Sequence, residues 1–519
     1  MELFTYCTIL LVSYLVLKLL KGKFSPSLPL PPGPNGYPII GNLLDMPAVM
    51  PWKTFQEWSK VYGDVMFLRL PGNPIVILGS TQATFDLLAK CSDIYSDRPT
   101  SVMQTMMFWD WAMSLMPYTQ TWREHRREFH QYFYQRKVPT YHPVQLAQCR
   151  AGLQRLLASP TENVGQNIRQ IFTAIILKVT YNLDITDLRD EYVVMAQKAL
   201  EGVSLGTVPG KFWVEFFPIL RHIPSWVPGN SAGKMADHYK PIVEFMRNKP
   251  FDEIKQDMMH GNIVPSIASS LIERVYKKSG EDYSTPINDT LARNVAGIAY
   301  AGSSDTTTSA AQSCLIAMSL YPDVQRKAQE ELDGVVGPNR LPDFDDHEDL
   351  VYLRAIVLEA MRWMVVLPLC IPHRVIRDDE YKGFLIPKGT IVMPSSRAML
   401  HDPEDYPEPE VFKPERFIKD GEINPAVRDP FTLAFGFGRR ICPGRYFSND
   451  ALFMTLASIL HTFNIHPILG ENGRKFDPET ELITGLISAP THVPCTVTPR
   501  SKKAEDLIRQ LPLSVGEAS

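Results

Sequence analysis

Apolar positions along the chain recur mostly at helical spacing, and this pattern covers most of the sequence after residue 81. Residues 67–78 are the main exception, because two short apolar runs flank the tetrapeptide Pro-Gly-Asn-Pro at 71–74. A turn rich in proline and glycine between two such runs predicts a β-hairpin. The pattern therefore predicts a mainly α-helical protein with a small β region.

The chain begins with an apolar run. Residues 3–17 carry no charge, and with the Lys18 side chain reaching toward the interface the run extends to Leu20. At about 1.5 Å per residue, this run is just long enough to cross a thin bilayer. Because Glu2 precedes it and lysines follow it, the charges favour a retained single-pass anchor over residues 1–23, with the rest of the chain cytosolic. A cleaved signal peptide is the alternative.

Residues 24–41 follow the anchor and are dense in proline. Prolines at this density impose an extended, semi-rigid backbone. The segment is therefore predicted to be a hinge that holds a globular domain at a set angle to the membrane. A plain structural linker is the simpler reading, and the two readings coincide here.

Residues 288–320 have the pattern of one long helix, which Pro322 ends. Within it, residues 301–309 read Ala-Gly-Ser-Ser-Asp-Thr-Thr-Thr-Ser. The glycine and the seven Ser, Asp and Thr residues that follow it are poor helix formers. Ser or Thr hydroxyls can also bond to the carbonyl four residues earlier and bend a helix. We expect a kink here. Because a purely structural helix gains nothing from it, the kink is predicted to be functional.

Composition describes an ordinary globular chain. The protein has 519 residues, of which 45% are hydrophobic and 21% charged, and its formal net charge is −4. Length alone suggests two or three domains, and nothing in the charge points to nucleic acid. The seven cysteines are odd in number and scattered, which argues against a disulfide framework and for a reducing compartment.

One cysteine lies in a glycine- and arginine-rich loop, residues 434–444, which reads Ala-Phe-Gly-Phe-Gly-Arg-Arg-Ile-Cys-Pro-Gly. Glycines let the backbone turn sharply or pass close to a flat ligand. The arginines, and the N-terminus of a helix expected just after the loop, favour the thiolate form of Cys442. The loop therefore has the composition of a metal site with one sulfur ligand. A buried structural cysteine is the alternative.

The string Phe435-x-x-Gly438-x-Arg440-x-Cys442-x-Gly444 resembles the haem-binding signature of the cytochrome P-450 superfamily of haem-thiolate monooxygenases. The resemblance implies haem b as the cofactor, with Cys442 as the axial ligand of its iron. It also implies that Phe435, Arg440 and Gly444 belong to the cofactor site.

The same resemblance implies a single catalytic domain in spite of the chain length. Its fold would be the cytochrome P-450 fold, mainly α with a small β region, over residues 42–505. One N-terminal transmembrane helix would precede it, and residues 506–519 would form a polar tail.

Two further motifs resemble the family's contacts to the haem propionates. Trp122 and Arg126 are one helical turn apart and resemble its WxxxR helix. Arg374 follows an apolar segment that passes the haem in the family, and Arg440 is a third candidate. Guanidinium groups suit carboxylates because they donate paired hydrogen bonds. For the basic residues, a solvated face or a docking surface for an acidic redox partner is the alternative.

The polar segment 301–309 resembles the family's oxygen-activation motif. The resemblance makes Asp305 and Thr306 the catalytic acid–alcohol pair, which would relay protons to the bound oxygen. Ser303 stands where many relatives have glycine or alanine, so the shape of the groove beside it is the part of the motif that departs from the pattern.

Three charged residues resemble the family's buried Glu–Arg–Arg triad. Glu359 and Arg362 are three residues apart on a predicted helix, and Arg416 lies in the sequence Pro-Glu-Arg-Phe. Exposed pairs at this spacing contribute little, whereas a buried triad that loses one partner keeps an uncompensated charge. The triad is therefore predicted to hold the core on the haem side and to take no part in the chemistry.

Several apolar segments are predicted to line the substrate cavity. Residues 103–116 are rich in methionine, which adapts to irregular ligands, and fall where the family has a loop over the substrate. Residues 212–228 resemble its lid. Ordinary core is the alternative for both. The predicted pocket residues are Met106, Phe108, Ile298, Gly302, Val366, Leu367 and Leu486.

The resemblance implies hydroxylation of a lipophilic small molecule with dioxygen and electrons from NADPH. The chain is similar to fungal microsomal members, so a secondary metabolite such as a terpenoid, an aromatic compound or an indole is the expected substrate. No GxGxxG or P-loop motif is present. The expected electron donor is therefore a separate NADPH-cytochrome reductase, with cytochrome b5 as a second donor. The implied location is the endoplasmic reticulum membrane.

Two other functions remain open at this point. A haem-thiolate isomerase or dehydratase that consumes no oxygen would share the cysteine loop, although the intact Asp305 and Thr306 argue against it. A non-catalytic haem-binding membrane protein is the second alternative.

Overall fold

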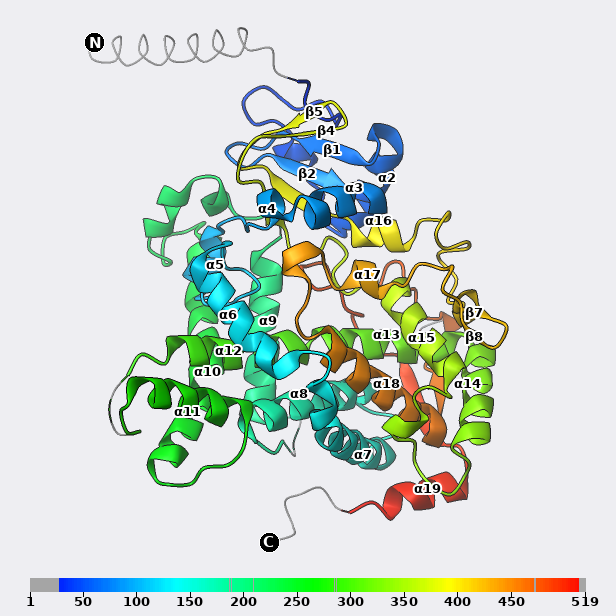
Figure 1. The fold of residues 1–519 in the computed structure, drawn as a ribbon. Coiled ribbons are helices and arrows are strands. Elements are labelled where there is room, and N and C mark those ends of the chain that lie inside the picture. Colours follow the sequence, from blue (N-terminus) through cyan, green and yellow to red (C-terminus); the bar gives the residue numbers. More distant parts are fainter. Residues whose placement is uncertain are drawn as a thin grey trace, which may run out of the picture.

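The computed structural model describes residues 28–512 apart from positions 186, 188, 209, 284, 286, 471 and 472. The predicted anchor, the start of the hinge and the end of the tail lie outside the described residues. A broad helical body carries a small sheet region at one end (Figure 1). This confirms the mainly α prediction with its small β region. Across the described part of the chain, none of the helices has both the length and the hydrophobicity that a bilayer crossing requires.

Four interior helices form the centre of the helical body. They are α8 (Val164–Tyr181), α12 (Thr290–Ser304), α13 (Thr306–Leu320) and α18 (Arg445–Thr462). Every residue of α13 from Thr307 to Ser319 is buried, as is α18 from Ala451 onward. A helix that is buried on all sides lies in the core of a large domain.

The remaining helices cover this centre and the sheet (Figure 1). Their bounds are α2 (Pro51–Tyr62), α3 (Thr81–Thr84), α4 (Ser92–Tyr95), α5 (Val102–Met106), α6 (Gln120–Phe133), α7 (His142–Ala158), α9 (Glu191–Gly206), α10 (Ser231–Met259), α11 (Ile267–Ser279), α14 (Pro322–Val335), α15 (Val351–Trp363), α16 (Ser396–Leu400), α17 (Phe431–Ala434) and α19 (Lys502–Arg509).

The helix predicted over residues 288–320 is interrupted at Asp305, where α12 ends and α13 begins. Hydroxyl groups around the break bond to carbonyls four residues earlier. Ser304 Oγ donates to the Tyr300 carbonyl at 2.9 Å, and Thr306 Oγ1 donates to the Gly302 carbonyl at 2.8 Å. The predicted kink is therefore found, with the hydrogen bonds expected to cause it.

The main sheet has the strand order β1-β2-β6-β3. The hairpin predicted over residues 67–78 is confirmed, because β1 (Val65–Leu68) pairs antiparallel with β2 (Ile75–Leu78). Strand β6 (Ile391–Pro394) runs parallel to β2, and β3 (His373–Arg374) pairs antiparallel with β6. Because β3 is held in this sheet, the segment just before His373 is also held in place, next to the helical body.

The smaller sheets are antiparallel pairs of strands. They are formed by β4 (Asp379–Tyr381) with β5 (Phe384–Ile386), β7 (Ile418–Lys419) with β8 (Glu422–Ile423), and β9 (Phe463–Pro467) with β10 (Cys495–Pro499). In the β7–β8 hairpin, Asp420 and Gly421 have φ of 54° and 82°. Two consecutive positive φ values are the mark of the tight turn that an Asp-Gly pair favours.

The three residues of the predicted triad meet in the interior. Arg362 and Glu359 form two parallel hydrogen bonds of 2.7 and 2.8 Å, and both side chains have zero exposure. Arg416 Nε lies 3.2 Å from the same carboxylate. Arg362 also donates to the carbonyls of Leu400 and Pro409. The triad therefore ties α15 to the long loop that leads toward Cys442.

Replacing Arg362 by Met is expected to lower the free energy of unfolding by about 3–5 kcal/mol, because the buried Glu359 carboxylate loses its bidentate partner. The midpoint of urea unfolding measures the change. Arg326→Met is the matched control, because Arg326 pairs with Glu330 on the surface, and it should leave the midpoint where it is. Equal midpoints for both variants would contradict a stabilising role for the triad.

Candidate active site

The loop around Cys442 is held by its own backbone and by its neighbours. The Cys442 N–H donates to the Phe435 carbonyl at 2.8 Å, and α18 begins three residues after the cysteine. Gly438 has φ of 54°, and a Cβ at this position would lie 2.1 Å from the Leu88 carbonyl oxygen. Only glycine fits there. The loop is therefore clamped against the segment after α3, and the sulfur has a defined position.

Two opposing effects act on the Cys442 thiol. Burial raises its pKa, while the Gly444 N–H and the positive charges of Arg126 and Arg445 act to lower it. Burial outweighs the cations, so the protein alone does not hold the thiolate that the sequence predicted. A coordinated metal ion deprotonates a thiol outright. The Cys442 thiolate would therefore be stabilised by a bound metal ion together with the nearby N–H group and arginines.

Two buried arginines, Arg98 and Arg440, form no ion pair with an acidic side chain among the described residues. Arg98 donates to the carbonyls of Ser114, Ile371 and Pro372 at 3.0, 2.6 and 2.8 Å. Arg440 donates to the Ser96 carbonyl at 2.7 Å and to the Met116 carbonyl at 2.8 Å, and these two residues lie before and after Arg98 in the sequence. These carbonyls fix the guanidinium groups in place, and the nearby Asp97 carboxylate offsets the cost of their burial only in part.

Burial lowers the pKa of both arginines. The positive charge of Arg440 lowers the pKa of Arg98 further. The pKa of Arg440 is lowered to about 10. The Arg440 guanidinium also stacks 4.3 Å above the ring of Trp122, one of the predicted cofactor residues. Keeping such charges buried is costly unless an anion joins them. The pair therefore fits a group with carboxylates of its own.

Arg126 is the third cation of this group. Burial lowers its pKa, and the largest effect in the opposite direction comes from Cys442. The structure thus brings together the predicted Trp122, Arg126, Arg440 and Cys442 from α6 and the cysteine loop. One sulfur next to Arg126, with Arg440 near Arg126 and Arg98 near Arg440, suits a metal-bearing cofactor with two carboxylates, which is the chemistry of a thiolate-ligated haem.

Arg374, a predicted propionate contact, also has a partner within the protein. Its Nε and Nη2 both bond to one oxygen of Asp97, at 2.9 and 2.5 Å. The other oxygen of Asp97 accepts the N–H of Tyr118 at 2.7 Å. The role predicted for Arg374 stays a prediction, and the structure adds the buried Arg98, which the sequence reasoning did not single out.

The predicted acid–alcohol pair lies at the break between α12 and α13. Gly302 is exposed and has open space where a side chain would extend. Asp305 forms an ion pair with Arg169 of α8, and both side chains are 15% exposed. No local sequence pattern indicates this partner. Thr306 keeps its hydroxyl on the Gly302 carbonyl.

One of the predicted pocket residues lines a small cavity of about 150 Å³. Leu486 lines it, together with Arg98, Gln104, Leu369 and Glu215. Gly485 fits tightly against α9, because a Cβ there would lie 2.1 Å from Ser204 Oγ. The other predicted residues lie outside its lining: Met106, Phe108, Ile298, Gly302, Val366 and Leu367.

Those residues nevertheless occupy the elements that the sequence predicted. Phe108 follows α5 with φ of 65°, and Arg247 of α10 lies 5.5 Å from its ring centre. Ile298 is buried on α12, and the Val366 carbonyl accepts the N–H of Ser488 at 2.8 Å. A bulky residue at positive φ is strained, which marks the Phe108 loop as a site held in an unusual shape.

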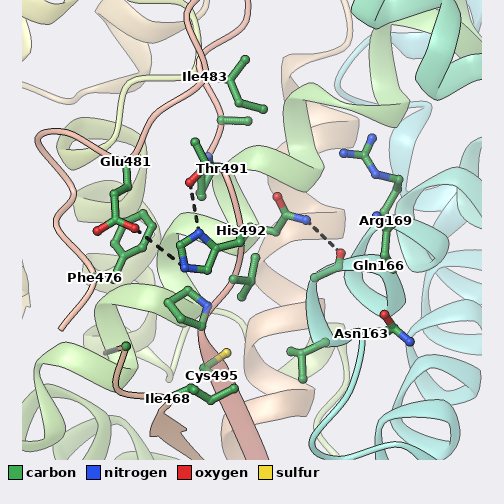
Figure 2. A pocket seen from close by; sticks show the side chains of 18 of the residues that line it. Asn163, Gln166, Arg169, Ile468, Phe476, Glu481, Ile483, Thr491, His492 and Cys495 are labelled. Carbon is green, nitrogen blue, oxygen red and sulfur yellow. Dashed lines mark hydrogen bonds and ion pairs between the residues drawn. The ribbon is translucent and has the colours of Figure 1, made fainter. Parts of the chain in front are cut away.

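A larger cavity of about 890 Å³ lies at the start of α8 (Figure 2). Arg169 and Gln312 are among its lining residues, and Gln312 Nε2 donates to the Gly165 carbonyl at 2.8 Å. Glu481 and His492 of the C-terminal loop face each other at 3.8 Å on the side opposite Arg169. The wall of this cavity therefore includes the ion-pair partner of Asp305.

The fold and the cationic pocket define a protein that holds an anionic cofactor through a single sulfur. A sequence profile described as "Cytochrome P450" matches residues 31–492. The chain is 39% identical over 508 residues to "Cytochrome P450 monooxygenase COX1" of Coprinopsis cinerea, covering 96% of this chain and 98% of that protein.

Other relatives are similar over most of the chain. "Cytochrome P450 monooxygenase ple1" of Rhodocybe pseudopiperita is 39% identical over 489 residues, which cover 93% of this chain and 92% of that protein. "Tryptamine 4-monooxygenase" of Psilocybe cyanescens is 36% identical over 480 residues, which cover 91% and 94%. This chain belongs to the cytochrome P450 family, whose cofactor is a haem with its iron bound by a cysteine thiolate.

Replacing Arg98 by Gln is expected to speed loss of haem from the protein about tenfold to a hundredfold, since one charged hydrogen-bond donor to the cofactor is lost. Transfer of haem to an apoprotein acceptor, followed in the Soret region, measures the rate. Arg127→Gln is the control, because Arg127 lies on the exposed face of α6. Identical rates for the two variants would show that Arg98 does not contact the cofactor.

Proposed function

We propose that this protein is a haem-thiolate monooxygenase that hydroxylates a neutral, lipophilic small molecule with dioxygen and electrons from NADPH. The observation that carries this proposal is the group of buried guanidinium charges around Cys442, which have no acidic partners among the described residues. Membership of the cytochrome P450 family supports the reaction class.

In this proposal Cys442 would hold the haem iron through its thiolate, and Arg98, Arg126 and Arg440 would hold the two propionates. Phe435 and Gly444 shape the loop on the sulfur side, and Trp122 holds Arg440 in place. When bound, haem with a thiolate ligand supplies the activation of dioxygen. The protein contributes the orientation of the cofactor, the exclusion of water and the delivery of protons.

Asp305 and Thr306 are proposed to deliver the protons. Thr306 lies beside Gly302, where the helix break leaves open space, so its hydroxyl can donate into that space when it leaves the Gly302 carbonyl. Asp305 is the adjacent carboxyl group, and once its ion pair with Arg169 opens it can take up a proton from water and pass it to Thr306. Until then the ion pair orients the carboxylate.

A neutral substrate is favoured by the charges of the small cavity. Glu215 is the one acidic residue that lines it among the described residues, and its carboxylate already accepts three hydrogen bonds from α5 and Ser101. A buried ammonium group without a partner is costly. A neutral terpenoid, aromatic compound or indole therefore fits better than an amine such as the one in the name of the Psilocybe relative. Spectral shifts on titration with neutral and amine candidates compare the two.

The electron donor is proposed to be a membrane-bound NADPH-cytochrome reductase, with cytochrome b5 as a second donor. The sequence has no dinucleotide-binding motif, and basic residues of α6 and the cysteine loop offer a surface for an acidic partner. The apolar run at residues 3–17 supports single-pass anchoring in the endoplasmic reticulum membrane, with the catalytic domain in the cytosol.

Replacing Cys442 by Ala is expected to abolish the thiolate-type Soret band of the reduced carbon monoxide complex, because it removes the sulfur that lies beside Arg126 and Arg445. The reduced difference spectrum measures it. Cys91→Ala, a matched change at a half-exposed cysteine, should retain the band. An unchanged band in the Cys442 variant would remove the proposed ligand.

Replacing Thr306 by Ala is expected to lower product formed per NADPH by about tenfold or more, since positioned proton transfer contributes at least this much to such steps. Oxygen and NADPH consumption are measured together with product. Thr307→Ala is the control, because the Thr307 hydroxyl faces Ser448 of α18 at 2.8 Å. Tight coupling in the Thr306 variant would contradict the proton-relay role, and product formation without oxygen uptake would favour an isomerase or dehydratase.

A further inference from the structure

One carboxylate joins the two segments that face each other across the small cavity. Glu215 lies in η4 (Trp213–Glu215), a short turn in the connection between α9 and α10. Its Oε1 accepts the Ser101 hydroxyl at 2.7 Å and the Met103 N–H at 2.8 Å, and its Oε2 accepts the Val102 N–H at 3.1 Å. Both carboxylate oxygens are therefore used to hold α5.

Helix α5 depends on this distant side chain for its first turn. The N-terminal N–H groups of a helix have no partners within the helix. In α5, Ser101 Oγ accepts only the Gln104 N–H, so Val102 and Met103 rely on Glu215. A five-residue helix has few internal hydrogen bonds and is marginal by itself. Loss of the carboxylate would thus leave two N–H groups without partners and free the start of α5.

The same residue fixes the rim on its other side. The Asn73 side chain donates to the Glu215 carbonyl at 3.3 Å, which connects the β1–β2 turn to η4. Three parts of the chain thus meet at Glu215: the hairpin turn, α5 and the connection between α9 and α10. All three contribute lining residues to the cavity of about 150 Å³, among them Asn73, Ser101 and Phe216.

We propose that Glu215 is the residue that holds the rim of this cavity closed, and that it thereby selects by size which ligands reach the haem. While its three hydrogen bonds persist, α5 and η4 stay together and only small molecules pass. When they break, the rim widens and bulky molecules enter. The contacts are independent of the proposed function, whereas the statement that the rim leads to the haem rests on it.

The test compares ligand association in the full-length holoenzyme. Glu215→Gln keeps the shape of the side chain but removes its charge and one acceptor oxygen. Association of imidazole and of a bulky azole is followed by the Soret shift in a stopped-flow instrument. The bulky azole is expected to associate about tenfold faster in the variant, as loss of hydrogen bonds to a charged group predicts, and imidazole at an unchanged rate.

Matched variants separate this role from general damage. Glu273→Gln makes the same chemical change on the exposed face of α11 and should alter neither rate. Ser101→Ala removes one of the three hydrogen bonds and should give a smaller acceleration of the bulky azole. If both azoles accelerate equally in Glu215→Gln, or if neither does, the proposal is overturned.

Hydrogen exchange gives a readout that needs no haem. Amides in a peptide covering Val102 and Met103 are expected to exchange faster in Glu215→Gln than in the Glu273 variant, because their acceptor is weakened. Unchanged exchange there would also overturn the proposal. Absence of any Soret response to imidazole in the unmodified protein would instead count against the proposed haem site, while the exchange result would still be readable.

Discussion

Burial of positive charge around one sulfur is the constraint on which the site depends. Arg98 and Arg440 are held by backbone carbonyls, which orient the guanidinium groups without neutralising them. Removing a charge from water costs several kcal/mol, even after the protein has relaxed around it. An anionic cofactor offsets that cost, so binding of the cofactor is expected to stabilise the folded state of this region.

The fold serves this arrangement by joining segments that are far apart in the sequence. The carbonyls that hold Arg98 come from the loop before α6 and from the segment before β3. That segment is fixed by the pairing of β3 with β6, and α15 beside it is tied by Glu359 and Arg362 to the loop that leads to Cys442. The small sheet and the buried triad thus act as supports for the cationic pocket.

The sequence allowed accurate prediction wherever the signal was local. The hairpin, the helix break at Asp305 and the helix after Cys442 each follow from residue types within a few positions of one another. The triad could be predicted as well, because its members resemble family motifs. The pairings of Arg374 with Asp97 and of Asp305 with Arg169 could not, since the partners are more than a hundred residues apart and many other charged residues could have met them. Arg98 was not predicted either. What distinguishes it is a property of the folded chain, namely burial without an ion-pair partner among the described residues.

The close fit of Gly485 against Ser204 has a mechanical consequence. Ser204 also accepts the N–H of Ile487 at its hydroxyl, at 3.3 Å, so the C-terminal loop is docked on the end of α9 by both shape and hydrogen bonding. Because Gly485 has no room for a side chain next to Ser204 and Ile487 is bonded to the same hydroxyl, a movement of this end of α9 is expected to move the loop with it. Breathing of the cavity on this side is therefore a concerted displacement of two chain segments, and a larger residue at 485 would jam it.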